Sequence, residues 1–144
     1  MSPRIPRTAL VDTGYWYALL DSRDEHHARA VARSDTLLRL RYLIPWPVVY
    51  ETLCTRFTRR PLAVKQFERI LKTPNAVKLD DAKYRDAALA IALDTTKPHP
   101  NTISAVDAVL RLVLDDPYNR IDCMFTFNPG DFLDVCVRRS VQIL

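Results

Sequence analysis

The sequence predicts a three-layer α/β/α fold in which helices cover both faces of a central parallel sheet of four to five strands. Short apolar runs such as Ala9 to Val11 are bounded by turn residues or acids, which suits buried parallel strands. Longer stretches with helical periodicity separate these runs, as crossover helices separate parallel strands. The 144 residues contain no internal repeat or low-complexity segment, so we expect one domain over residues 1–144.

The first half of the chain is predicted to begin with the strand Ala9 to Val11 and a short apolar helix from Tyr15 to Leu20. A second helix is expected from Glu25 to about Arg41, with Asp24 as its cap. The further elements of this half are a strand at Leu43 and Ile44, a helix from Val48 to about Arg60 that follows Pro47, and a helix from Leu62 to Lys72.

The second half is predicted to begin with the strand Ala76 to Leu79 and a helix that Asp80 or Asp81 caps. Residues 94–101 contain Pro98 and Pro100 and are expected to form a loop. The remaining predicted elements are a helix from about Ser104 to Leu114, a strand from Ile121 to Thr126, a short helix opened by Asp131 and Phe132, and an edge strand from Val141 to Leu144.

The composition excludes several classes of function. With only two glycines, the chain has neither a GxGxxG nor a Walker sequence for cradling phosphate. Cys54, Cys123 and Cys136 lack metal-ligand spacing and are expected to be free thiols in a reducing cytoplasm. No window approaches the length of an apolar membrane span, and we predict neither a span nor a signal peptide. The net charge of +4 mildly favours anionic partners.

Two acids stand out because their surroundings are apolar. Asp12 directly follows the first predicted strand, and open α/β sheets bind ligands at the carboxyl ends of their strands. A helix N-cap is the alternative role for Asp12. Asp107 interrupts an apolar helix, where an unpaired carboxylate is costly. The spacing from Ser104 to Asp107 also fits a capping box, and both interpretations stay open.

Two further acids belong to the same pattern. Glu51 lies early in the third predicted helix, where the helix dipole favours it, although exposed helix glutamates are common. Asp131 lies in the segment Thr126 to Phe132 after another apolar strand, and a first-turn acid is its plain structural role. Since Asp12 and this segment each follow a strand, we expect them to face one crevice.

Carboxylates gathered at close range repel one another, so such a site normally holds a hard divalent cation. Mg²⁺ takes one or two carboxylates together with waters and substrate phosphate. The bound ion activates a water and stabilises charge on a phosphoryl oxygen. Acids, a basic chain and the absence of a phosphate-cradling glycine loop together suggest metal-assisted phosphodiester hydrolysis.

The order of these motifs resembles that of PIN-domain ribonucleases. The motifs are Asp-Thr after the first strand, Glu51 on the third helix, Ser-Ala-Val-Asp-Ala at 104–108 and Thr-Phe-Asn-Pro-Gly-Asp-Phe at 126–132. The chain is most similar to the single-domain toxins of VapBC-type toxin–antitoxin pairs, and the resemblance covers essentially its whole length. It implies a flavodoxin-like parallel sheet, in agreement with the predicted elements.

The resemblance also implies a site. Its metal-binding, catalytic acids would be Asp12, Glu51, Asp107 and, in the last motif, Asp131, with Mg²⁺ or Mn²⁺ as the cofactor. Residues orienting these carboxylates or the attacking water would be Thr13, Ser104, Thr126 and Asn128. The sequence departs from the family pattern in two places. Gly14 replaces a small polar residue, and Asn128 replaces an acid of many members, which leaves a second metal position unspecified.

The predicted function is therefore that of an endoribonuclease in the cytoplasm, a homodimer silenced by a protein antitoxin and without a membrane partner. Arg56, Arg59 and Arg60 are candidate contacts to an RNA backbone, with a solvated charged face as the alternative. Two other functions remain open: a PIN-like module that binds RNA or protein without cutting, and a metal-dependent phosphatase. The phosphatase hypothesis is less favoured, because no second acid lies two residues after Asp12 to form a D-x-D pair.

Overall fold

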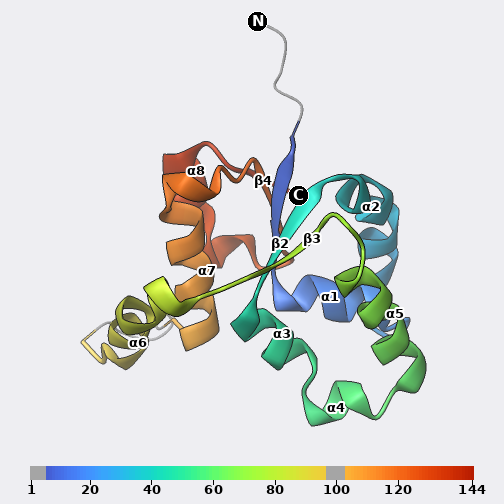
Figure 1. The fold of residues 1–144 in the computed structure, drawn as a ribbon. Coiled ribbons are helices and arrows are strands. Elements are labelled where there is room, and N and C mark those ends of the chain that lie inside the picture. Colours follow the sequence, from blue (N-terminus) through green and yellow to red (C-terminus); the bar gives the residue numbers. More distant parts are fainter. Residues whose placement is uncertain (1–5, 97–102) are drawn as a thin grey trace, which may run out of the picture.

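The computed structural model describes residues 6–96 and 103–144, and its centre is a five-stranded parallel sheet (Figure 1). The strand order is β3-β2-β1-β4-β5, and every pairing is parallel. The strands are β1 (Thr8–Val11), β2 (Arg41–Pro45), β3 (Ala76–Leu79), β4 (Cys123–Phe125) and β5 (Gln142–Ile143). This confirms the predicted fold class.

Helices form a layer on each face of the sheet. One group consists of α1 (Thr13–Leu20), α2 (His27–Arg39), α3 (Trp46–Thr52), α4 (Thr55–Thr58) and α5 (Pro61–Leu71). The other consists of α6 (Arg85–Leu93), α7 (Ala105–Asp115) and α8 (Leu133–Arg139), with the 3₁₀ turns η1 (Ala82–Tyr84), η2 (Pro117–Asn119) and η3 (Pro129–Asp131). Figure 1 shows α6, α7 and α8 on one side and α2 and α5 on the other. Right-handed crossovers produce this division, because the chain adds strands first on one side of β1 and then on the other.

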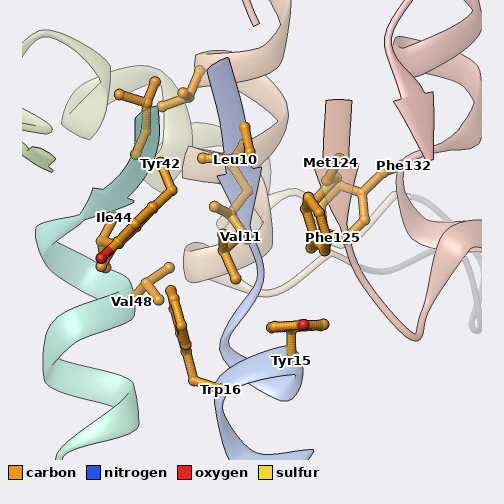
Figure 2. Packing of buried hydrophobic residues seen from close by; sticks show 14 of the residues in the cluster. Leu10, Val11, Tyr15, Trp16, Tyr42, Ile44, Val48, Met124, Phe125 and Phe132 are labelled. Atoms are coloured by element: carbon orange, nitrogen blue, oxygen red, sulfur yellow. The ribbon is translucent and has the colours of Figure 1, made fainter. Parts of the chain in front are cut away.

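The core is built around β1, whose four residues are all buried. Figure 2 shows Leu10 and Val11 between the side chains of β2 and β4, with Tyr15 and Trp16 of α1 beneath them. The Tyr15 ring meets Phe125 edge-on at a centroid distance of 5.3 Å. Burial of these apolar side chains is the main force that holds α1 against the sheet.

The helix predicted from Val48 to about Arg60 is wrong as one element, because it is divided into α3 and α4. The backbone of Cys54 is extended, with φ −68° and ψ 165°, so the helix cannot continue through it. The carbonyl of Glu51 accepts a hydrogen bond from the Tyr17 hydroxyl, and this tertiary contact satisfies a group at the end of α3. No local sequence pattern predicts the contact between Tyr17 and Glu51.

Other predicted boundaries shift by a few residues. Asp24 does not cap α2: the cap position is His26, whose backbone N–H donates to the Asp24 carboxylate over 2.8 Å. Asp81 occupies the cap position of η1 rather than of α6, and its side chain makes no capping bond. Most of the loop predicted over 94–101 lies outside the described residues.

The three cysteines are free, as predicted. Cys123 and Cys136 are buried, and burial raises the pKa of the Cys123 thiol to about 12 and that of Cys136 to about 11. Both therefore behave as packed apolar side chains. Across residues 6–96 and 103–144, every helix is too short or too polar to cross a membrane.

Replacing Leu10 by alanine is expected to lower the free energy of unfolding by about 2–5 kcal/mol, since it opens a cavity in the central strand. Urea denaturation measures the change. Leu62→Ala is the matched control, because Leu62 is 80% exposed and its truncation should change stability by less than about 0.5 kcal/mol. Equal losses in the two variants would contradict the central place of β1.

Candidate functional site

The candidate site lies at the carboxyl edge of the sheet between β1 and β4, where the strand order reverses. Asp12 follows β1, and its backbone N–H donates to the Phe125 carbonyl over 3.0 Å. Thr126 follows β4, and its hydroxyl donates to Oδ2 of Asp12 over 3.0 Å. Asp12 occupies the cap position of α1 but makes no side-chain capping bond, so its carboxylate is directed to Thr126 instead.

Thr126 is fixed from two sides. Its hydroxyl oxygen accepts the backbone N–H of Asn128 over 3.0 Å while the hydroxyl proton goes to Asp12. Both side chains are buried, with Asp12 only 6% exposed. Thr126 therefore holds the Asp12 carboxylate in one orientation, while the side chain of Asn128 is exposed at the start of η3.

Asp107 reaches the same edge from the first turn of α7. The Ser104 hydroxyl accepts the backbone N–H of Asp107 over 3.1 Å, which confirms the N-terminal half of the predicted capping box. The Asp107 carboxylate is half-buried. The two interpretations of Asp107 are thus compatible. Its backbone N–H takes part in the helix cap, and the cap fixes the first turn of α7, from which its carboxylate extends.

Glu51 and Asp131 are exposed and lie at the rim of the site. Glu51 is carried by α3, which contacts both α1 and α7. Asp131 is the last residue of η3, after the Thr126 segment. The negative charge of Glu51 acts on both Asp12 and Asp107, and that of Asp131 acts on Asp107. Asp107 is therefore within electrostatic reach of the other three predicted acids, whereas Asp131 is not among the main charges acting on Asp12.

The two inner carboxylates have perturbed acidities. Burial raises the pKa of Asp12 to about 6; the hydrogen bond from Thr126 opposes this rise, and the charges of Asp107 and Glu51 add to it. Burial also raises the pKa of Asp107, with contributions from the charges of Asp131 and Glu51 and opposition from Ser104 and Arg111. Such groups take up either a proton or a cation.

Arg111 is a residue of the site region that the sequence analysis missed. Its guanidinium donates to the Asp131 carbonyl over 2.7 Å and forms a two-pronged ion pair with Asp134 at 2.8 and 2.6 Å. It thereby ties η3 and α8 to α7 and fixes the backbone that carries Asp131. A signal was available: Arg111 is the one basic residue in α7, a turn after Asp107.

The predicted RNA contacts do not surround the acids. Arg56 and Arg60 line a separate pocket of about 190 Å³ together with Tyr17 and Cys54. Arg60 pairs with Asp21 at 3.0 Å, and Arg59 is exposed nearby. Their function as RNA contacts remains a prediction.

The donor set suits a hard divalent cation, although the described residues contain no group of three Asp, Glu, His or Cys side chains close enough to enclose one. Mg²⁺ needs no such cage, because one or two carboxylates, waters and substrate phosphate suffice. Asp12 and Asp107, whose charges influence each other, are the candidates for that pair. The Thr13 hydroxyl beside Asp12 is buried, and together with Trp16 Nε1 it lacks a hydrogen-bond partner in the described chain. An unpaired buried polar atom of this kind fits a bound water or ion.

Gly14, the other departure from the family pattern, is not required by crowding. A Cβ atom at this position would have no neighbour within 4 Å, so the small polar residue usual in PIN-domain ribonucleases would fit.

The structure closely resembles that of Mycobacterium tuberculosis VapC20, a toxin that cleaves the sarcin–ricin loop. The TM-score is 0.67 with 20% sequence identity, and the match covers 88% of this chain and 94% of VapC20. The chain has a VapC-like PIN fold. No protein-family model and no curated protein sequence matches the chain. The PIN resemblance predicted from the four motifs is confirmed at the level of the fold.

Asp12→Asn is expected to stabilise the metal-free PIN fold near neutral pH. The native pKa of Asp12, about 6, lies above the ordinary value of 3.8, so between these values the native state holds a proton that the unfolded state has lost. Wild-type stability therefore falls as pH rises through this window, by up to about 3 kcal/mol. The asparagine side chain still has an oxygen that accepts the hydrogen bond from Thr126. Because it cannot ionise, the variant avoids this loss of stability.

Urea denaturation in EDTA near pH 4 and near pH 7 measures this difference. Asp12→Asn should match the wild type near pH 4 and exceed it near pH 7. Asp35→Asn is the control, because Asp35 is an exposed acid on α2 and its loss should change stability by less than about 0.5 kcal/mol. A loss of stability in Asp12→Asn near pH 7 would contradict the burial of an uncompensated carboxylate.

Proposed function

We propose that this protein is a Mg²⁺- or Mn²⁺-dependent endoribonuclease and the toxin of a toxin–antitoxin pair. The observation that supports the proposal is that acids from four separate segments of a VapC-like PIN fold influence one another: the charges of Asp107 and Glu51 act on Asp12, and those of Asp131 and Glu51 act on Asp107. Clustered carboxylates with a raised pKa are characteristic of sites that bind a divalent cation.

Asp12 and Asp107 are the proposed inner ligands, and Glu51 and Asp131 complete the site from its rim. A bound divalent cation supplies an activated water and stabilises negative charge on the phosphoryl oxygen. Thr126 holds the Asp12 carboxylate, and Ser104 fixes the turn that carries Asp107. Because the pKa of Asp12 is about 6, this carboxylate is mostly ionised near pH 7 and available as a ligand.

RNA is the proposed substrate class. VapC20, which shares the fold, cleaves the sarcin–ricin loop, and a net charge of +4 favours a polyanionic substrate here. A homodimer and a protein antitoxin are further parts of the proposal, and they rest on the VapC-like fold. Cytoplasmic action follows from the same proposal.

Purified protein is expected to cut RNA in Mg²⁺, and Asp12→Asn or Asp107→Asn should reduce kcat/KM at least about 100-fold. Removing a ligand costs more than the 10–100-fold typical of residues that only orient one. Asp35→Asn, on the exposed surface of α2, should cut like the wild type. If either site variant cut RNA at the wild-type rate, the assigned acids would be wrong.

The cleaved ends distinguish the proposed chemistry from attack by the RNA itself. Attack by water leaves no cyclic phosphate, because the ribose 2′-hydroxyl takes no part. RNA with a 2′-deoxyribose at the cleaved position should therefore still be cut. Mapping RNA ends after induced expression, with Asp12→Asn as the inactive control, also identifies the target.

Mn²⁺ is expected to raise the melting temperature of the wild-type protein and to leave that of Asp12→Asn almost unchanged. A ligand at about 100 times its Kd stabilises the native state by about 2.7 kcal/mol, which is a shift of several degrees for a chain of this size. Differential scanning fluorimetry over a Mn²⁺ series measures it, with Asp35→Asn as the control. No stabilisation of the wild type would favour the non-cutting binding module, and turnover of an aryl phosphate but not of RNA would favour the phosphatase.

A further inference from the structure

A second concave surface adjoins the acid site. It is a pocket of about 340 Å³ between α2, the segment after β4 and the end of β5. Its lining residues are Arg29, Arg33, Thr126, Phe127, Pro129, Ile143 and Leu144. Thr126 belongs to both places, because its hydroxyl donates to Asp12. The pocket therefore lies beside Asp12, on the other side of the buried Thr126.

The two arginines of this pocket have no Asp or Glu side chain as an ion-pair partner among the described residues. Arg29 and Arg33 lie four residues apart on α2, so they share a face of the helix. Within the described part of the chain, neither arginine forms an ion pair. Other arginines do: Arg111 pairs with Asp134, and Arg60 pairs with Asp21. The guanidinium groups of the pocket are therefore available to an external anion.

Aromatic packing holds one of these arginines in place. The Arg29 guanidinium lies 5.2 Å from the centroid of the Phe127 ring. The same ring stacks on Tyr15 at 5.7 Å and on His26 at 4.5 Å, with interplanar angles of 11° and 7°. The Tyr15 hydroxyl donates to the Ala30 carbonyl over 2.8 Å, which joins α1 to α2. Since this stack orders Arg29 in advance, little side-chain entropy remains to be lost on binding.

Charge explains why an RNA nuclease needs such a pocket. Four carboxylates at the site repel an RNA backbone wherever its phosphates are not screened by a cation. A pair of free guanidinium groups at the border of the acid cluster offsets that repulsion for a neighbouring phosphate, and guanidinium matches phosphate geometry with two parallel hydrogen bonds. The pocket supplies this pair on the Thr126 side of Asp12.

We propose that Arg29 and Arg33 bind a backbone phosphate of single-stranded RNA next to the phosphate that is cut, with Phe127 holding Arg29 in position. This inference rests on the proposed action on RNA. It adds a path for the substrate, which runs over the Thr126 side of the acid site. It also places the principal backbone contact on α2 rather than at Arg56 and Arg59.

The test measures binding without cleavage. In an Asp12→Asn background, the Kd for a short fluorescein-labelled single-stranded RNA is measured by anisotropy over a range of salt concentrations. Each neutralised phosphate contributes about 0.7 to the slope of log K against log salt for single strands, and both arginines are proposed to bind one phosphate, so Arg29→Gln/Arg33→Gln should reduce the slope by about 0.7. Arg29→Lys/Arg33→Lys keeps both charges and should retain most of the slope.

The matched control is Arg39→Gln/Arg41→Gln, which removes the same charge from exposed positions at the other end of α2 and the start of β2. It should leave the slope nearly unchanged. Arg33→Gln alone spares the Phe127 stack and should raise the Kd and lower the slope by part of that ~0.7, which provides a readout if the double variant unfolds. An unchanged slope in the Arg29/Arg33 variants, equal losses in the control, or a larger loss in Arg56→Gln/Arg59→Gln would overturn the proposal.

Cleavage by protein that retains Asp12 is measured in parallel. Cutting of RNA together with an unchanged salt slope in Arg29→Gln/Arg33→Gln would overturn the phosphate pocket and keep the nuclease. If the salt slope fell in Arg29→Gln/Arg33→Gln but the wild-type protein never cut RNA, the proposed nuclease activity would be wrong and the RNA-binding pocket would stand. If the Asp12→Asn parent bound no RNA, the pocket would be rejected.

Discussion

The structure depends on one electrostatic constraint: negative charge is concentrated where β1 and β4 end. Asp12 is 6% exposed there, and burial together with the charges of Asp107 and Glu51 raises its pKa to about 6. A fold evolved for stability alone has no reason to hold a carboxylate in this state. Among the described residues, the hydrogen bond from Thr126 and, to a smaller extent, that from the Thr13 backbone oppose this rise in pKa without cancelling it, which leaves the site receptive to a cation.

The scaffold makes this concentration possible because it brings distant segments to one edge. Strands β1 and β4 are neighbours in the sheet although more than a hundred residues separate them, and both end at the same level. The cap at Ser104 sets the first turn of α7, and Arg111 ties η3 and α8 to the same helix. The acids of the rim thus stand on rigid elements rather than on long loops, which suits a site that requires a fixed geometry.

Acidic and basic surfaces meet at Thr126. On one side its hydroxyl contacts Asp12, and on the other Thr126 lines the pocket of Arg29 and Arg33. Phe127, the next residue, packs on Tyr15 of α1 and on His26 beside α2. The segment after β4 therefore couples the position of a candidate metal ligand to that of a candidate phosphate contact, and a polyanionic substrate benefits from both.

The sequence by itself determined the fold class, the strand segments and the cap at Ser104, because these depend on local patterns: short apolar runs and an S-x-x-D spacing. The roles of the four acids, which the order of the motifs suggested, stay a prediction. Only the tertiary structure decided that the third helix is interrupted, since the Tyr17 hydroxyl reaches Glu51 from another helix. It also decided the pairing of Arg111 with Asp134 and the stacking of Phe127 with His26 and Arg29. These contacts join residues far apart in the chain, and no local pattern encodes the geometry that brings them together.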